Sequence, residues 1–339
     1  MTGSQIHSKE AHAKIVNNVK YLLKRLDNEP IPSDKEEIRL FAVARNEELR
    51  LPYFLQYYFK NGVDRVFIID NCSTDSTVEI ALSVENVHVF QVQQDYKGNY
   101  GYWMEYFLET YGTNYWCIVV DIDELFLYPF IENISIKDLT SYCDNNNYTA
   151  VKSLLIDVYS DKDLRDTIYT PGTDPLIICP YFDVEYFSLK NSCFDKKNGC
   201  SFDFEFYFGG MRRRVFLENL HDPLFCLSKV PLLKYSRSTY LSPGMHTVNG
   251  SRLADVSGCV MHTKFMSDFL EEADIESKRE QHYESGIEYK IYAEKIIREK
   301  AKLNLFCEKS VRFSSSLQLI ELNLMCAPQS YIAFLLGKD

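Results

Sequence analysis

The sequence predicts an α/β protein with a mostly parallel sheet flanked by helices and with helical additions at both ends of the chain. Two observations lead to this prediction. Short apolar runs alternate with helical segments between residues 38 and 120, and three of the runs end in clusters of polar side chains. This alternation is typical of parallel sheets, in which crossover helices join the strands. Ligands of such sheets bind at the carboxyl ends of the strands, so the polar clusters predict a site there.

The first 37 residues are expected to form a helix and a linker that precede the sheet. Residues 11–27 carry apolar side chains on one side of a helix, which indicates an amphipathic helix. Residues 28–37 are polar and contain Pro30 and Pro32, which favours a linker.

The following segment supplies the strands and helices in regular order, and Gly62 and Gly112 are expected to end two of the helices. Asp75 or Ser76 is expected to cap a third helix, which is short. The predicted strands are 38–44, 65–69, 87–92 and 115–120, and the other predicted helices are 52–60 and 102–111.

After about residue 150 the alternation fades, and residues 157–200 are rich in Asp, Tyr, Cys and turn-forming residues. We therefore divide the chain into residues 1–37, a core domain of 38–267 and a helical C-terminal extension of 268–339. Within the core domain, residues 38–150 are expected to bind nucleotide and 151–267 to face an acceptor. The apolar tail 317–336 is interrupted by polar residues and Pro328, so we expect it to pack or to contact another subunit.

The composition and net charge of the chain argue against some classes of function. The chain has 339 residues, 46% hydrophobic and 25% charged, as in ordinary globular proteins. The net charge of −11 argues against a nucleic-acid partner.

The ten cysteines show no C-x-x-C spacing, so a zinc knuckle is unsupported, and Cys117 and Cys259 lie in apolar runs that predict burial. There is no signal-peptide-like start and no apolar run of about 18 residues, so we expect a cytoplasmic protein. A position at the inner face of the membrane stays open.

The most informative motif closes the fourth apolar run, where Asp121, Ile122 and Asp123 are followed by Glu124. Carboxylates at the end of a buried strand are costly unless something pairs them. In an extended segment Asp121 and Asp123 point to the same side, and two such oxygen ligands suit Mg²⁺ or Mn²⁺ carrying a diphosphate. The alternative is a solvated acidic turn, since short motifs recur by chance.

An ordered set of motifs resembles the GT-A nucleotide-sugar domain of family 2-like glycosyltransferases. The motifs are residues 43–47 (VARNE), 68–75 (IIDNCSTD) and 121–126 (DIDELF). Residues 209–216, 229–233, 244–246 and 253–265 resemble a bacterial branch of the same superfamily, and the match spans about residues 38–290. The acidic motif of that family is commonly D-x-D-E-F, whereas here Leu125 precedes Phe126.

The resemblance implies a nucleotide-binding role for the residues that follow the first three strands. Asp70 should hold the base, although an Asx-turn with Ser73 or a helix cap is the structural alternative. The loop with Lys97 and Gly98 should cover the nucleotide, and a solvated loop lysine is the alternative there. The residues expected to flank the base and ribose are Ala44, Arg45, Asn46 and Glu47.

The resemblance also implies a metal site. Asp121 and Asp123 should hold Mn²⁺ or Mg²⁺, with Asp121 and Ile122 also beside the nucleotide-sugar, and His262 is the best third ligand. A histidine at a strand end is otherwise usually a hydrogen-bonded structural residue. Lys264, two residues on, should face the same way and meet phosphate.

The catalytic base is not identified by the sequence. Asp203 and Glu205 precede a Gly-Gly loop, and His246 is a third candidate for taking the acceptor proton. Arg212 and Arg214 would alternate on one face if extended, where they could clamp phosphate or an acidic acceptor sugar. A solvated strand face is the alternative.

The function expected from these motifs is a metal-dependent glycosyltransferase that moves a sugar from a UDP- or GDP-sugar to a glycan or glycolipid acceptor. The bacterial resemblance suggests surface polysaccharide, capsule or lipopolysaccharide synthesis by a transfer that inverts the stereochemistry of the sugar. Peripheral membrane association and a homo-oligomer through the C-terminal segment stay open. A sugar-1-phosphate nucleotidyltransferase is an alternative, but it would carry a Gly-rich loop after the first strand. A non-catalytic carbohydrate-binding protein is another, but it would not need Asp70, the D-x-D motif and His262 together.

Overall fold

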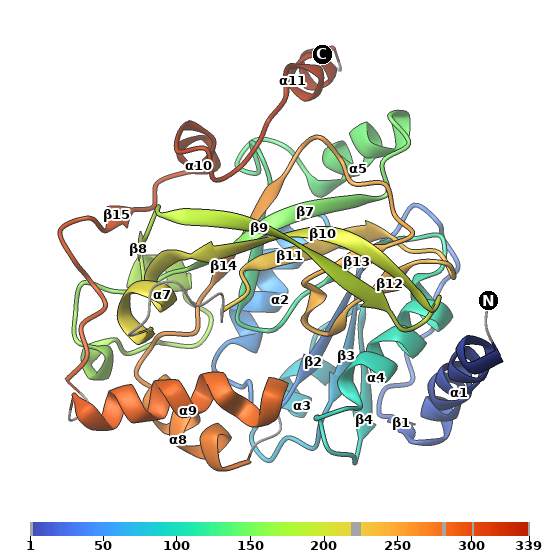
Figure 1. The fold of residues 1–339 in the computed structure, drawn as a ribbon, viewed down its shortest axis with the longest axis horizontal. Helices are drawn as coiled ribbons and strands as arrows, with labels where there is room; N and C mark the ends of the chain where they lie inside the picture. Colours follow the sequence, from blue (N-terminus) through green and yellow to red (C-terminus); the bar gives the residue numbers. More distant parts are fainter. Residues whose placement is uncertain (1–2, 218–224, 280–282, 300–301, 338–339) are drawn as a thin grey trace.

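The structure, a computed structural model, describes residues 3–217, 225–279, 283–299 and 302–337 (Figure 1). The helices are α1 (Gly3–Asn18), α2 (Leu51–Lys60), α3 (Thr77–Leu82), α4 (Tyr100–Phe107), α5 (Ile136–Asn145), α6 (Pro175–Ile178), α7 (Gly210–Phe216), α8 (Phe269–Arg279), α9 (Tyr283–Arg298), α10 (Ser316–Glu321) and α11 (Gln329–Leu336). The strands are β1 (Leu23–Arg25), β2 (Ile38–Ala44), β3 (Arg65–Asp70), β4 (Val87–Val92), β5 (Trp116–Val119), β6 (Glu124–Leu127), β7 (Ala150–Asp157), β8 (Tyr181–Phe182), β9 (Tyr186–Asp195), β10 (Cys200–Gly209), β11 (Ser228–Lys234), β12 (Tyr240–Leu241), β13 (Val248–Asn249), β14 (Gly258–His262) and β15 (Val311–Arg312).

The central sheet has nine strands in the order β1-β4-β3-β2-β5-β11-β7-β14-β6. Strands β4, β3, β2 and β5 are parallel neighbours, and β11 is antiparallel to both β5 and β7, so β7 points the same way as β5. Strand β14 is parallel to β7, and only β1, β11 and β6 run against this common direction. The mostly parallel α/β sheet expected from the sequence is confirmed.

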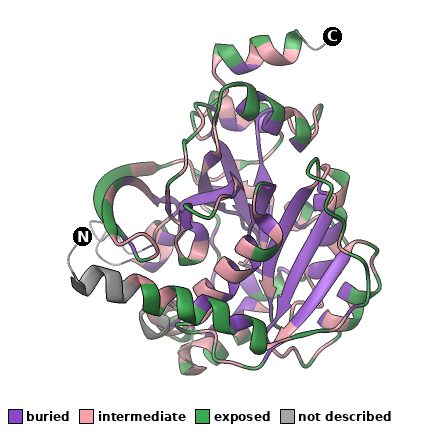
Figure 2. Ribbon diagram, turned by 90° about the vertical axis from the view of Figure 1, so that its right-hand side faces the viewer, coloured by how far each residue is buried: buried purple, intermediate pink, exposed green. Residues whose placement is uncertain are grey.

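Both faces of the sheet are covered, which explains why its strands are continuous apolar runs rather than alternating ones. Along β2, Leu40 and Ala42 belong to the core on the side of α2, whereas Phe41 belongs to the core on the side of α4. Figure 2 shows the sheet strands as the most buried part of the molecule, with exposed residues on the surrounding helices and on the β9–β10 hairpin. Cys117 and Cys259 are buried, as expected.

The N-terminal prediction is wrong for its last part. The helix does not continue to residue 27: α1 ends at Asn18, a single 3₁₀ turn follows, and β1 pairs with β4 at the edge of the sheet. The Leu26 amide donates to the Val89 carbonyl at 2.8 Å. Strand β4 would otherwise present unpaired backbone groups, and pairing with this edge outweighs the local helical pattern.

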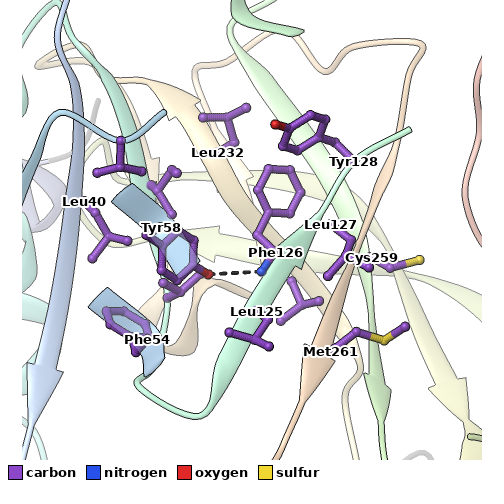
Figure 3. Packing of buried hydrophobic residues seen from close by; sticks show 14 of the residues in the cluster. Leu40, Phe54, Tyr58, Leu125, Phe126, Leu127, Tyr128, Leu232, Cys259 and Met261 are labelled. Atoms are coloured by element: carbon purple, nitrogen blue, oxygen red, sulfur yellow. Dashed lines mark hydrogen bonds between the residues drawn. The ribbon is translucent and has the colours of Figure 1, made fainter. Parts of the chain in front are cut away.

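The segment after the D-x-D motif also departs from expectation. Ile122 and Asp123 form a turn rather than an extended segment, because the chain reverses here into β6, which pairs antiparallel with β14. Tyr58 of α2 holds the start of β6: its hydroxyl donates to the Glu124 carbonyl at 2.9 Å and accepts from the Phe126 amide at 3.0 Å (Figure 3). The acidic turn is therefore attached to the buried core.

The C-terminal helices pack onto this core at two places. Helices α8 and α9 lie next to each other and bury Phe269 and Tyr292 in a third apolar cluster together with Phe216 of α7. Helix α11 contacts α5, where the Tyr331 and Tyr142 rings meet edge to face with centroids 4.9 Å apart. Within the described residues, no helix combines the length and apolarity that crossing a membrane requires.

Candidate active site

Charged side chains converge at one edge of the sheet. The common-direction strands all end at this edge, and the reversed strands β11 and β6 begin there. Such an edge is where α/β sheets bind ligands. The residues brought there by β3, the turn after β5, β6, β7, β11 and β14 are Asp70, Asp121, Asp123, Glu124, Asp157, Lys229 and His262.

Asp123 and His262 meet across about 140 residues of chain. The Asp123 Oδ2 to His262 Nε2 distance is 3.0 Å, and the Asp123 carbonyl accepts from the Thr263 amide at 2.8 Å. Burial alone would lower the pKa of His262, but the charge of Asp123 and the hydrogen bonds to Asp123 and Asp157 together raise it. Burial would raise the pKa of Asp123, yet the charge and hydrogen bond of His262, with the charges of Lys264 and Arg50, hold it well below its usual range. The pair thus favours a proton, or another cation, between Nε2 and the carboxylate.

The other ring nitrogen of His262 is fixed by a second carboxylate. Nδ1 donates to Asp157 Oδ1 at 2.7 Å, and Asp157 is only 2% exposed. Arg212 binds the same carboxylate in two places, Nε to Oδ2 and Nη2 to Oδ1, both at 2.8 Å. Arg212 Nη2 also lies 2.9 Å from His262 Nδ1, so the guanidinium and the ring share Asp157 Oδ1.

A buried lysine faces the first aspartate of the motif. Lys229 Nζ lies 2.6 Å from Glu124 Oε1 and 3.6 Å from Asp121 Oδ2. Glu124 Oε2 in turn accepts from the Asp121 amide at 3.2 Å, which supports the turn. The side chain of Asp121 is 38% exposed, against 16% for Asp123, so Asp121 is the carboxylate that faces solvent.

Lys264 reaches the same cluster, as the sequence suggested. Its Nζ lies 3.9 Å from Asp123 Oδ2 and 3.3 Å from Glu272 of α8, and it donates to the Tyr289 hydroxyl of α9 at 2.6 Å. Helices α8 and α9 therefore contribute polar groups to this edge of the sheet.

The loop after β2 lies beside the Asp70 loop. Arg45 is exposed and donates to the Asn71 carbonyl at 2.7 Å, Asn46 accepts from the Thr74 amide at 2.8 Å, and the Ala44 carbonyl accepts from the Asn71 amide at 2.9 Å.

Glu47, the last residue of the VARNE motif, carries a buried Oε2 for which no hydrogen-bond partner is found in the described chain. Burial raises the pKa of Glu47 to about 8, against the lowering charge of Arg50. A buried carboxyl oxygen without a partner is an unused hydrogen-bonding position beside the predicted nucleotide site.

Asp70 ends β3 and is fully buried. It accepts from the Ser73 amide at 3.1 Å and from Gln91 Nε2 at 2.9 Å, so the structural alternative, a turn with Ser73, is present. A carboxylate has about four acceptor sites, and these two bonds leave capacity for a base N–H. The role of Asp70 with the nucleobase stays a prediction.

The predicted covering loop follows β4. Lys97 and Gly98 are exposed, and Gly98 has φ +77, a conformation that favours glycine. Burial, and then the charge of Asp121, raise the pKa of the neighbouring Tyr96.

The candidate bases are placed unequally. Asp203 is exposed on β10, and Glu205 accepts from Lys152 Nζ and Ser188 Oγ, both at 2.9 Å. No contact in the described chain joins either carboxylate to the Asp121–Asp123 turn.

His246 donates from Nδ1 to the Ser228 carbonyl at 2.9 Å, next to Lys229. Burial, with the Lys229 charge, lowers the pKa of His246 to about 3, so its ring is neutral.

Arg212 and Arg214 do not lie on an extended strand as considered from the sequence. They belong to α7, where successive residues are turned by about 100°. Arg212 points to Asp157, whereas Arg214 binds Asp183 at 2.7 Å and 2.9 Å. Neither guanidinium is held ready for phosphate in this arrangement, and the clamp stays a prediction.

Sequence reasoning missed Asp157 and Lys229. Asp157 ends the apolar run 150–156 in the same way that Asp70 and Asp121 end theirs, so the signal was present in the sequence. Lys229 precedes the apolar run 230–233, at the start of a strand that runs against the others, and the direction of that strand is set only by tertiary pairing.

The oxygen and nitrogen donors of Asp121, Asp123 and His262 are of kinds that bind divalent cations, and one distance between these donors also suits such an ion. Two neighbouring ligands at about 2.1 Å from an octahedral ion lie about 3 Å apart, and Asp123 Oδ2 and His262 Nε2 are separated by 3.0 Å. Asp121 lies two residues away and is solvent-facing. Among the described residues no group of three or more His, Cys, Asp or Glu side chains is already gathered as a metal site, so Asp121 would have to turn toward the pair.

No protein-family model matches the chain, and no curated protein matches it. Among solved structures, the chain is similar to glucosyl-3-phosphoglycerate synthase from Mycobacterium tuberculosis, solved with Mn²⁺, uridine diphosphate and glucosyl-3-phosphoglycerate. The identity is 18% and the TM-score 0.26, and the alignment covers 35% of this chain and 44% of that enzyme. The chain thus spans less than half of the length of that enzyme.

Proposed function

We propose that this protein is a metal-dependent glycosyltransferase that transfers a sugar from a nucleotide-sugar to a glycan or glycolipid acceptor. The proposal includes a UDP- or GDP-sugar as donor, Mn²⁺ or Mg²⁺ as cofactor, inversion at the transferred sugar, and a role in surface polysaccharide or lipopolysaccharide synthesis.

The single observation that carries the proposal is the meeting of Asp123 and His262 at 3.0 Å at the carboxyl edge of the sheet. The two residues lie in motifs that resemble the same family but are far apart in the sequence. A solvated acidic turn would not need a buried imidazole against its second carboxylate.

In this proposal, residues at different places along the sheet edge bind the cation, the nucleoside and the phosphate. Asp121, Asp123 and His262 would hold the cation, which when bound neutralises charge on the leaving nucleoside diphosphate. Asp70 has acceptor capacity for an N–H group of the base, and Glu47 offers an unused hydrogen-bonding position for base or ribose. Lys264 lies close enough to Asp123 to bind a phosphate oxygen beside the cation.

Proton transfer from the acceptor hydroxyl falls to Asp203, Glu205 or His246 in this proposal. A neutral His246 with a pKa of about 3 takes up a proton poorly at neutral pH. The hydrogen bond from Lys152 likewise lowers the pKa of Glu205, so proton affinity does not separate these candidates.

The test is the product released from a panel of nucleotide-sugars in the presence of Mn²⁺. A glycosyltransferase releases nucleoside diphosphate, even by slow hydrolysis when acceptor is missing, and Asp123→Asn should remove that release. Release of pyrophosphate from a nucleoside triphosphate and a sugar phosphate would instead identify a nucleotidyltransferase.

A further inference from the structure

Three elements meet in a buried chain of contacts that starts at the predicted metal ligand. His262 of β14 donates from Nδ1 to Asp157 of β7, and Arg212 of α7 grips Asp157 with two bonds of 2.8 Å. All three side chains are less than one tenth exposed. The Nε2 atom of His262 is left pointing at Asp123.

We propose that Asp157 and Arg212 are positioning residues that hold the His262 ring with Nε2 facing a divalent cation. The inference rests on the proposed function, since it assumes that His262 is a metal ligand. Ligating histidines commonly donate their other ring N–H to a carboxylate, which fixes both the tautomer and the direction of the ring. The 2.7 Å bond from Nδ1 to Asp157 is such a bond.

Stability alone is a poor reason for this arrangement. A buried ion pair often contributes no more than well-packed apolar side chains of the same volume would. In this pair Asp157 is also the hydrogen-bond acceptor that sets the orientation of the His262 ring. Replacing the pair with apolar residues would therefore leave the ring without that hydrogen bond. Without Arg212, the buried Asp157 carboxylate would have the His262 ring as its one remaining side-chain hydrogen-bond partner among the described residues.

The backbone before α7 is shaped to deliver Arg212 to this place. Gly209 has φ +128, and a Cβ atom there would lie 2.4 Å from the Glu185 carbonyl oxygen. Gly210 follows with φ +61 and starts the helix. This double-glycine turn ends β10, and the helix α7 that follows passes across the end of β7, where Asp157 lies.

The same helix supplies a matched control. Arg214 binds Asp183 with bonds of 2.7 Å and 2.9 Å, through the same two guanidinium nitrogens that Arg212 uses. Asp183 accepts from the Tyr159 hydroxyl rather than from a histidine. Asp183→Asn therefore removes a pair of the same geometry, in a more exposed place, without touching His262.

The experiment measures Mn²⁺ affinity by the loss of the free-ion signal in electron paramagnetic resonance, with Mn²⁺ alone and with Mn²⁺ and UDP. The full-length wild type is compared with Asp157→Asn, Arg212→Lys, His262→Gln and the control Asp183→Asn. We expect Asp157→Asn and Arg212→Lys to bind Mn²⁺ about 10–100-fold more weakly. The control should bind Mn²⁺ as tightly as the wild type, and a ¹⁴N coupling to Mn²⁺ should be lost in His262→Gln.

The outcomes separate this inference from the proposed function. If the wild type binds no Mn²⁺ under either condition, the proposed function fails and the inference fails with it. If His262→Gln loses Mn²⁺ but Asp157→Asn and Arg212→Lys keep wild-type affinity, or if Asp183→Asn weakens it equally, only the inference is overturned.

A measurement on the wild type covers the case in which both variants misfold. In ¹H–¹⁵N spectra with Mg²⁺, the His262 signal, assigned by its absence in His262→Gln, should show a protonated Nδ1. An unprotonated Nδ1 would contradict the positioning role.

Discussion

Replacing Lys229 with methionine should destabilise the protein far more than the same change at Lys234 in the same strand. Both lysines of β11 form ion pairs of similar length, 2.6 Å to Glu124 and 2.7 Å to Asp144. They differ in burial. The side chains of Lys229 and Glu124 are 5% and 2% exposed, whereas those of Lys234 and Asp144 are 38% and 44% exposed.

The magnitude follows from that difference. At an effective dielectric constant of about 20, unit charges 2.6 Å apart attract by about 6 kcal/mol, and part of this offsets the desolvation of the lysine. Removing one partner of a buried pair typically costs about 3–5 kcal/mol because the other charge is left without compensation. The exposed Lys234 pair contributes about 0–1 kcal/mol.

The loss at Lys229 should also depend on pH. Burial, opposed by the Lys229 charge, raises the pKa of Glu124, and without Lys229 it should rise further. A carboxyl group with a raised folded-state pKa binds its proton more tightly in the folded than in the unfolded protein. Its contribution to stability therefore declines as the pH rises above the unfolded value, and the deficit of Lys229→Met should be smaller at pH 5 than at pH 7.5.

Urea unfolding followed by tryptophan fluorescence at pH 5 and 7.5 measures both effects. A loss below about 1 kcal/mol for Lys229→Met, equal to that of Lys234→Met, would refute the reasoning, as would the same deficit at both pH values. The double variant with Glu124→Gln should recover part of the loss, because no buried charge is then left alone.

Three further predictions concern other parts of the molecule. Tyr58→Phe removes the hydroxyl that bonds β6 at the Phe126 amide and should lower the free energy of unfolding by about 1–3 kcal/mol in the same urea assay; no change would mean that this hydroxyl does not hold β6. Burial lowers the pKa of His88, against the raising effect of its bond to Asp27, so its contribution to stability is present above the unfolded pKa of about 6.5 and is lost as the pH falls below it. The unfolding midpoint should accordingly drop more steeply from pH 7 to 5.5 in the wild type than in His88→Gln, and parallel curves would count against this. Asp70→Ala should weaken UDP binding in calorimetry by about 1–3 kcal/mol, and unchanged affinity would leave only its turn-forming role.

The nucleotide-binding half could be predicted because its strands are buried on both faces. Strands β2 and β4 have the predicted bounds, since a continuous apolar run between turn signals leaves few alternatives. The Asp121–Asp123 turn could not be predicted in the same way. Its reversal depends on β14, which lies more than 130 residues later and provides the partner for β6.

The site was predictable where each residue ends an apolar run. His262 and Asp123 meet because β14 and β6 are paired, and the late histidine motif indicated the first of these strands. The place of Lys229 in the site and the helical conformation at Arg212 could not be predicted from the sequence, because the reversed direction of β11 and the turn at Gly209 are set by tertiary contacts.

Metal-dependent nucleotide binding tests the central claim most directly. Calorimetry with UDP and with GDP should be run on the wild type in Mn²⁺ and in EDTA, and on Asp123→Asn in Mn²⁺. We predict that at least one of the two nucleotides binds the wild type in Mn²⁺, and that this binding is lost in EDTA and in Asp123→Asn. Equal affinity with and without metal, or no binding of either nucleotide under any condition, would contradict the assignment of this edge of the sheet as a nucleotide-sugar site.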